Sequence, residues 1–297
     1  MFHPGERLAQ KKAGYEHVNA ALYTAMPEQH RLFFAGLRQF YFSIPDAEGH
    51  PVASVLQGMP GFVSAPDAGH LLINRASLEA VTYLPELKTG MRVGGLGLDL
   101  SNRRRNRVNG IIESLSAEAI TLAVEESFGN CPQYIQRRIL PDNSPERLPQ
   151  LEELAVLDAD ARYLIAAADT LFIASQAQRE KGVGGADISH RGGLPGFIEL
   201  KQGRLHIPDF PGNRYMNTLG NLLVEPQCAL LIMDFHQGAA LHIQGKADIL
   251  WQPPAGPIER WLIVEPERIL RIRQLLPAAG LAVEYAGTSL TAGNKKG

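Results

Sequence analysis

Short apolar runs, separated by glycine, proline and polar residues, dominate the chain. In the first half these runs cover residues 40–42, 51–57, 61–64 and 71–74, and in the second half they cover 171–174, 186–191, 197–200 and 204–207. Regularly spaced short strands with glycine and proline between them are typical of small barrels and sandwiches. The pattern therefore predicts a mainly β protein.

Helical spacing of apolar residues appears at fewer places. Helices are predicted over residues 28–37 and 160–169, the second with Asp158 or Asp160 as its N-cap. Further helices are predicted over 77–84, 213–223 and 265–275. Two pairs of longer strands are expected to form hairpins at 102–104 and 236–238. The chain thus combines short strands with a few flanking helices.

The two halves of the chain repeat each other. Residues 58–62 (GMPGF) recur as 193–197 (GLPGF), and the same offset of 135 positions relates Ser54 to Ser189. Upstream the offset falls to 131, which places a four-residue insertion near residues 176–183. A repeat of about 100 residues has the size of a small domain. The sequence therefore predicts a tandem duplication.

The repeat and the proline pattern divide the chain into four parts. A leader and a first barrel are predicted over residues 1–140, a proline-rich linker over 141–150, and a second barrel over 151–286. The small, polar end at 287–297 is expected to be disordered. The leader, residues 1–26, is expected to pack on the first barrel.

Composition narrows the class of protein. The chain has 297 residues, of which 45% are hydrophobic and 20% charged, and a net charge of −2. This balance gives no general attraction to nucleic acid or to an anionic membrane, so neither is an expected partner. Cys131 and Cys228 occupy non-equivalent positions in the two repeats, which argues against a disulfide framework or a thiolate metal site. No export signal or membrane span is evident, and a cytoplasmic protein is expected.

Two polar segments interrupt the apolar frame of the second repeat. The first is 187–193 (DISHRGG), and the second is 208–218, which ends a strand and opens a predicted helix. A helix N-terminus and a guanidinium both favour a phosphate, so Asn213 and Arg214 are phosphate candidates. The alternatives are a solvated strand end for the first segment and a simple helix cap for the second.

Residues 103–107 (RRRNR) form the densest charge cluster, on a predicted hairpin tip. Solvated charge is one interpretation, and contact with a ligand of the other barrel is another. Alternation along the strand sends Arg105 and Arg107 to one face, so at most half of the cluster can serve one site. Residues 182–187 (GVGGAD) match a dinucleotide fingerprint only weakly, and the sequence motifs for phosphate loops, zinc proteases and serine hydrolases are missing.

These segments resemble the pyridoxamine 5′-phosphate oxidase-like superfamily of FMN-binding split barrels. The similarity covers about residues 2–250 and is most specific over 187–247. The N-terminal repeat resembles the bacterial subfamily in which two such barrels are fused, through residues 2–6, 26–31, 103–110 and 128–134. The resemblance implies a mainly β (α+β) fold: a tandem duplication of a six-stranded FMN-binding split β-barrel with flanking helices.

The resemblance also implies a flavin site at the interface of the two barrels. Ser189, His190 and Arg191 match its second-strand position, and Asn213 and Arg214 match its phosphate-binding segment. Four further residues complete the predicted FMN site: Asp209, Asn217, Arg105 and Arg107. No metal is implied.

The chain departs from the oxidase itself in two respects. Ala240 stands where a flavin-contacting glutamine is expected, and the C-terminal substrate-binding motif of arginine and histidine is missing. Pyridoxamine phosphate oxidation is therefore not implied. The tandem chain is expected to form an intramolecular pseudo-dimer with two unequal sites. The second repeat is the better candidate, because Leu56 stands in the first where Arg191 stands in the second.

The leading functional hypothesis is an FMN-dependent oxidoreductase. A small-molecule redox substrate is expected, with NAD(P)H or a protein as the electron donor, and the resemblance leaves catalysis open. The alternatives are a non-catalytic flavin- or haem-binding protein for sensing, transport or storage, and a two-domain scaffold. The substrate, the catalytic residues and any further dimerisation are left unassigned.

Overall fold

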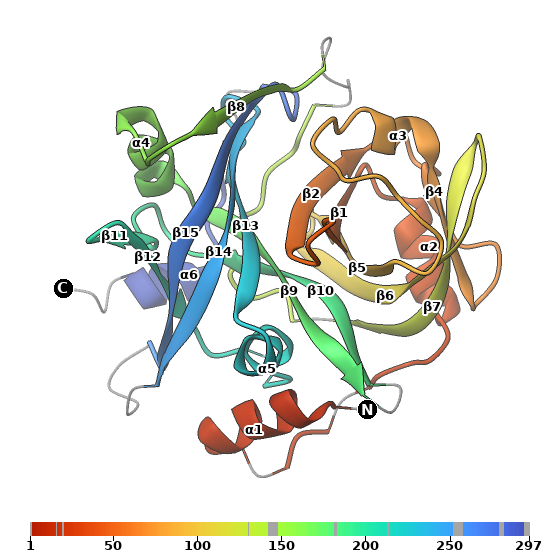
Figure 1. Cartoon of the computed structure of the whole chain (residues 1–297), viewed down its shortest axis with the longest axis horizontal. Coiled ribbons are helices and arrows are strands. Elements are labelled where there is room, and N and C mark those ends of the chain that lie inside the picture. The colour runs from red at the N-terminus through yellow and green to blue at the C-terminus, as the bar shows by residue number, and fades with distance from the viewer. Residues whose placement is uncertain are drawn as a thin grey trace.

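Antiparallel strands arranged in two sheets make up most of the molecule (Figure 1). The computed structural model describes residues 2–15, 17–19, 21–129, 131–141, 148–180, 183–212, 214–251, 258–278 and 282–293. Within them, no helix is long and apolar enough to cross a membrane. The predicted fold class, a mainly β tandem of barrels with flanking helices, is confirmed.

The N-terminal sheet has the strand order β2-β1-β5-β6-β7-β4-β3 and lies on the right in Figure 1. Its elements, with the helices before and within it, are α1 (Pro4–Lys12), α2 (Glu28–Ala35), β1 (Gln39–Pro45), β2 (Pro51–Gln57), β3 (Val63–Ser64), β4 (His70–Asn74), α3 (Arg75–Glu79), β5 (Arg92–Asp99), β6 (Arg104–Leu115) and β7 (Ala119–Gly129).

The C-terminal sheet has the order β10-β9-β13-β14-β15-β12-β11, with β8 paired to β15 outside this path. Its elements are β8 (Gln150–Leu154), α4 (Ala159–Ala167), β9 (Thr170–Glu180), β10 (Val183–Gly192), β11 (Glu199–Lys201), β12 (Arg204–Asp209), α5 (Asn217–Val224), β13 (Gln227–Asp234), β14 (Ala239–Trp251), β15 (Arg260–Arg273) and α6 (Gly287–Gly293). Element by element, this order repeats that of the first sheet.

The strand registers of the two sheets also match. Ser54 lies opposite Phe42 in the first hairpin, and Ser189 lies opposite Ile173 in the second, so the sequence offsets of 135 and 131 are both reproduced. Both sheets also have a β-bulge at the same place: Glu125 is the extra residue of β7 opposite Asn109 and Gly110, and Glu267 is the extra residue of β15 opposite Gln244 and Gly245.

A glycine occupies the same place in both bulges for the same reason. A Cβ on Gly110 would lie 2.2 Å from the Ala123 carbonyl oxygen, and one on Gly245 would lie 2.1 Å from that of Glu265. Only glycine allows such a close backbone approach. Bulges bend a strand and increase its twist, which closes each sheet in the same way.

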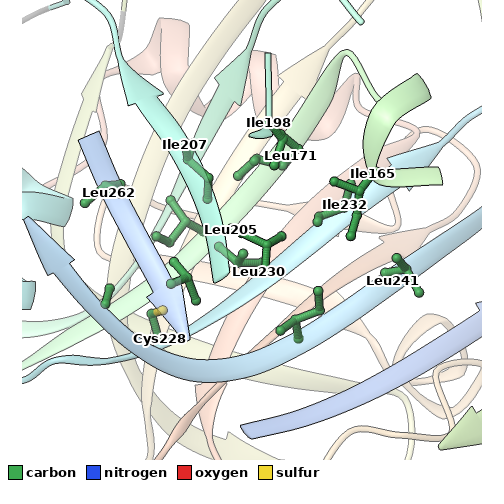
Figure 2. Packing of buried hydrophobic residues seen from close by; sticks show 14 of the residues in the cluster. Ile165, Leu171, Ile198, Leu205, Ile207, Cys228, Leu230, Ile232, Leu241 and Leu262 are labelled. Atoms are coloured by element: carbon green, nitrogen blue, oxygen red, sulfur yellow. The ribbon is translucent and has the colours of Figure 1, made fainter. Parts of the chain in front are cut away.

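Each barrel has its own apolar core, and a third core joins them. Figure 2 shows the second barrel's core, where Leu171, Leu205, Leu230 and Leu241 converge with the buried Cys228. The first barrel is filled by the side chains around Phe34, Phe40 and Phe42. The third core draws on both sheets. In it the rings of Tyr41 and Phe172, which are equivalent residues of the two repeats, stack with centroids 3.5 Å apart.

Three sequence predictions about the elements are wrong in whole or in part. Residues 265–275 were predicted to be a helix, but 260–273 form strand β15. The leader was expected on the first barrel. Its end lies there, with Tyr23 paired to Ser127 and Met26 in the first barrel's core, but α1 packs against α5 of the second, with a Gly5 Cβ position only 2.3 Å from the Gly220 carbonyl oxygen.

The tail, 287–297, was expected to be disordered, but 287–293 form α6, where the buried Ser289 accepts a hydrogen bond from Gln136. Residues 294–297 lie outside the described residues.

The predicted linker, 141–150, cannot be compared in full, because 142–147 lie outside the described residues, while Gln150 already begins β8. The other predicted helices are present with shifted ends. Asp158 caps α4, accepting a hydrogen bond from the Ala161 amide at 2.9 Å. The two predicted hairpins join β5 to β6 and β13 to β14.

Candidate functional site

A cavity of about 110 Å³ lies where β6 of the first barrel meets β10, the end of β12 and the start of α5 in the second. We call it the Arg105 pocket. Eight of the nine predicted site residues line it: Arg105, Arg107, Ser189, His190, Arg191, Asp209, Arg214 and Asn217. The ninth, Asn213, lies outside the described residues. The fold thus brings together side chains that are up to 112 positions apart in the sequence, while their role as ligands stays a prediction.

Alternation along β6 divides the arginine cluster as the sequence suggested. Arg105 and Arg107 face the pocket. Arg103, at the hairpin tip, instead donates hydrogen bonds to the Ile135 carbonyl and to Glu284. Arg104 is exposed, with its guanidinium 5.2 Å from the centre of the Phe33 ring.

Arg107 is the most buried cation of the site, and both of its terminal nitrogens have protein partners, while its Nε has none among the described residues. Its Nη1 donates to Asp187 Oδ2 and to Asn217 Oδ1, both at 3.0 Å, and its Nη2 donates to Ser189 Oγ at 2.6 Å. Thr218 Oγ1 also donates to Ser189 Oγ, at 2.9 Å. Burial raises the pKa of Asp187 to about 6, although the charge of Arg107 opposes this rise. Arg107 is therefore neutralised by protein groups and ties the two barrels together.

Asp209 neutralises a second pair of arginines. It accepts hydrogen bonds from Arg191 Nη1 and from Arg260 Nε, and Arg260 has a second acidic neighbour in Glu259. Asp209 is 4% exposed, so its carboxylate orients the arginines. Asp209 also lines the pocket, and its predicted role as a cofactor contact stays a prediction.

Arg105 differs from these arginines because no described carboxylate pairs with it. Its Nη1 lies 3.3 Å from His190 Nδ1, and its Nε is buried with no hydrogen-bond partner among the described residues. Burial lowers the pKa of Arg105 to about 9, and the neighbouring charges of Arg107 and Arg191 add to this effect. Arg105 is half-buried, and a cation withdrawn from water without a counter-charge is costly, so this position favours an anion.

His190 stays neutral beside this cation. Burial, followed by the charges of Arg105, Arg138 and Arg191, lowers its pKa well below the ordinary value. With Nδ1 accepting from Arg105, the proton of the ring is on Nε2, and that atom has no partner within the described chain. His190 thus offers the pocket a donor without adding charge.

The loop before α5 completes the rim of the pocket. Arg214 and Met216 have left-handed backbones, with φ of 65° and 63°, and no side chain caps the helix at Met216. The first amides of a helix lack intrahelical partners, and the helix dipole favours an anion there. Tyr134 stacks on Phe210 at the edge of the pocket, with ring centroids 5.1 Å apart.

Sequence reasoning missed Arg260, Thr218, Tyr134 and Phe210, all of which line the pocket. Phe210 and Thr218 lie inside the polar segment 208–218, which gave a usable signal. Arg260 gave none, because no strand was predicted at residue 260 and its equivalent in the first repeat is the neutral Ala119.

No family model matches the chain, and no curated protein matches it either. Solved structures with some similarity include a HupZ variant from Group A Streptococcus, at 13% identity over 39% of this chain and 99% of that chain, with a TM-score of 0.31. A "putative pyridoxamine 5′-phosphate oxidase" from Lactobacillus delbrueckii has 17% identity over 36% of this chain and 95% of its own, with a TM-score of 0.26. An FAD-binding protein from Mesorhizobium loti has 12% identity over 41% and 97%, with a TM-score of 0.28. Similarity this low supports no inference about the function of this chain.

Proposed function

We propose that the chain binds FMN with its phosphate in the Arg105 pocket and acts as an FMN-dependent oxidoreductase on a small-molecule substrate. The supporting observation is Arg105, a desolvated guanidinium with no described carboxylate beside it. A phosphate group supplies the missing counter-charge and accepts several charge-assisted hydrogen bonds. Arg191 and the neutral His190 offer further buried donor atoms, since Arg191 Nε and His190 Nε2 lack partners among the described residues.

The size of the pocket fits the phosphate end of the cofactor. Its volume of about 110 Å³ is below the roughly 300–1,000 Å³ of a site that encloses a whole organic ligand. The ring system of FMN would therefore lie outside this cavity. When bound, FMN supplies the redox chemistry. The protein groups hold the phosphate, and Asp209 and Asp187 keep Arg191 and Arg107 in place.

Comparing FMN with riboflavin tests the phosphate assignment directly, because riboflavin lacks only the phosphate. We expect FMN to bind at least tenfold more tightly than riboflavin in a titration followed by flavin fluorescence. Arg105→Ala should remove most of this difference, since a charge-assisted contact contributes about 1.5–3 kcal/mol, or roughly 10- to 100-fold. Arg104→Ala is the matched control, because Arg104 is exposed and does not line the pocket. Equal affinities for FMN and riboflavin would reject the assignment.

Catalysis needs a separate experiment. FMN-loaded protein is mixed with NADH or NADPH, and oxidation is followed by absorbance. Turnover supports the oxidoreductase, whereas tight FMN binding without turnover by either donor favours a non-catalytic flavin-binding protein. A visible spectrum of the purified protein with a Soret band in place of flavin bands would instead favour haem.

A further inference from the structure

The loop that carries Arg214 into the pocket has a backbone that needs external support. Two of its non-glycine residues, Arg214 and Met216, are in the left-handed region. Such conformations cost energy and persist only where surrounding contacts hold them. The support for residues 214–217 comes from the other end of the chain.

The N-terminal segment, residues 2–15, contacts this loop at three successive points. The Arg214 guanidinium lies 4.9 Å from the centre of the Tyr15 ring. Gln10 Nε2 donates to the Tyr215 carbonyl at 3.0 Å, and Asn217 Nδ2 donates to Glu6 Oε1. Gln10 is 2% exposed and Glu6 is 6% exposed, whereas Arg214 is exposed. The α1 side of the two hydrogen bonds is therefore buried, and the contact with Tyr15 lies at the surface.

Glu6 determines which way the Asn217 amide points. Burial raises the pKa of the Glu6 carboxyl group to about 8. Its Oε2 accepts from the His3 amide at 2.8 Å, and its Oε1 takes the Asn217 NH₂ group as a donor. The Asn217 carbonyl oxygen therefore faces Arg107 Nη1 and accepts from it at 3.0 Å. With the amide reversed, two donors would meet. Glu6 is thus connected to the cation that holds Ser189 in the pocket.

The two helices that make this connection are closely packed. In Figure 1, α1 lies next to α5. A Cβ on Gly220, in the middle of α5, would lie 2.5 Å from the Glu6 Cα atom. Because the contact is with backbone, α1 cannot stay in place if Gly220 acquires a side chain. Docking of α1 is therefore sensitive to a single methyl group.

We infer that residues 2–15 are a positioning element for the Arg105 pocket, and that docking of α1 is coupled to anion binding through Glu6, Asn217 and Arg107. The identity of the anion as the phosphate of FMN rests on the proposed function, whereas the coupling itself does not. Coupling between two equilibria is reciprocal. A docked α1 tightens binding in the pocket, and an occupied pocket holds α1 in place.

Gly220→Ala separates docking from the stability of α5. Alanine is a better helix former than glycine, so α5 itself is not weakened, but its methyl group excludes α1. Gly36→Ala is the matched control, because a Cβ there makes only ordinary contacts, the nearest at 3.6 Å. In wild type we expect FMN to slow amide hydrogen exchange in residues 4–12. Gly220→Ala should show rapid exchange there with or without FMN, and about tenfold weaker FMN binding.

Variants of Glu6 test the connection itself. Glu6→Ala removes the acceptor of the Asn217 amide and should weaken FMN binding several-fold, with global unfolding monitored in parallel. Glu6→Gln keeps an acceptor oxygen and should restore most of the affinity, which a purely structural role for α1 would not require. Wild-type affinity in Glu6→Ala would overturn the assigned route of coupling.

The two proposals fail in different ways. If wild type binds FMN but exchange in α1 is unchanged by it, and Gly220→Ala binds FMN normally, the coupling is rejected and the proposed function stands. If FMN does not bind wild type, the same exchange experiment is run with inorganic phosphate. Slower exchange in residues 4–12 would then support the coupling without the flavin, and unchanged exchange would reject it.

Discussion

The Arg105 pocket has a counterpart on the first barrel that is lined by the equivalents of β10, β12 and α5, but by no residue of β14, the equivalent of β6. The counterpart is a cavity of about 610 Å³ lined by β2, the turn after it, α3 and Leu275, and no charged side chain of the described chain lines it. Six charged residues of the Arg105 pocket network have neutral equivalents in the other repeat, and of these equivalents Asn74 lines this cavity. The pairs are Arg105 and Ala240, Arg107 and His242, Asp187 and Val52, Arg191 and Leu56, Asp209 and Asn74, and Arg260 and Ala119.

The pair Arg107 and His242 shows the difference most clearly. Arg107 crosses the barrel interface to donate to Ser189 on β10. His242 crosses it in the equivalent direction, but its Nε2 accepts from the Ala53 amide on β2 at 3.1 Å. One residue brings a charge that needs an acid beside it, and the other brings a neutral ring. The fold repeats the same interface, and the side chains decide whether charged or neutral groups cross it.

The largest expected effect comes from leaving Arg107 without its acid. Asp187→Asn should lower the free energy of unfolding by about 3–5 kcal/mol, because the partner of a buried ion pair is then buried unpaired. The double variant Asp187→Val with Arg107→His places the equivalent neutral residues, those at Val52 and His242, in the second barrel and should recover most of the lost stability. Urea unfolding at pH 7 measures both. A cost below about 1 kcal/mol for Asp187→Asn would show that water reaches Arg107.

Local sequence was enough to find most of the charged site. Residues 187–193 and 208–218 are contiguous, and the period of two along β6 separates Arg105 and Arg107 from their neighbours. Predicting the sheets was possible because the repeat fixed which runs are equivalent strands. Contiguous segments, the strand period and the repeat can all be recognised from neighbouring residues or from one fixed sequence offset.

Other features depend on contacts that no window contains. The bulge in β15 leaves Glu267 unpaired between Pro266 and Arg268, which interrupts the alternation of apolar residues and gives 265–275 an apparent helical period. The docking of α1 on α5 joins residues more than 200 positions apart. Neither the repeat nor the periodicity contains this information, because α1 lies before the part of the chain that is repeated.

Acid should destabilise the folded protein through His242, the equivalent of Arg107. Burial lowers the pKa of His242 to about 4, with the charge of Arg268 adding to this effect and that of Asp46 opposing it. The unfolded chain, with a pKa near 6.5 for this group, then binds more protons than the folded one between about pH 6.5 and pH 4. The contribution of His242 to stability is therefore complete above pH 6.5 and is lost as the pH falls towards 4, by up to about 3 kcal/mol.

His242→Gln keeps a hydrogen-bond acceptor for the Ala53 amide but cannot be protonated. Between pH 7 and pH 4 it should lose less stability than wild type, as measured by urea unfolding at each pH. The contribution of Asp187 to the pH dependence of stability has the opposite sign. Its raised pKa makes the folded state bind more protons than the unfolded state between about pH 3.8 and 6, so acid stabilises the fold through this group. Parallel pH profiles for wild type and His242→Gln would show that the pKa of His242 is the same in the folded and the unfolded chain.

The smallest expected difference concerns the two equivalent serines. Ser189 Oγ accepts from both Arg107 and Thr218, so Ser189→Ala should cost about 1–1.5 kcal/mol of stability and weaken FMN binding several-fold. Ser54 Oγ accepts from the Tyr83 hydroxyl, which keeps the Ala53 carbonyl at 3.1 Å as a second acceptor. Ser54→Ala should therefore change stability by no more than about 0.5 kcal/mol and leave FMN binding unchanged. Equal effects of the two substitutions on FMN affinity would mean that the first barrel also contributes to FMN binding, although its interface has neutral residues where the second barrel has charged ones.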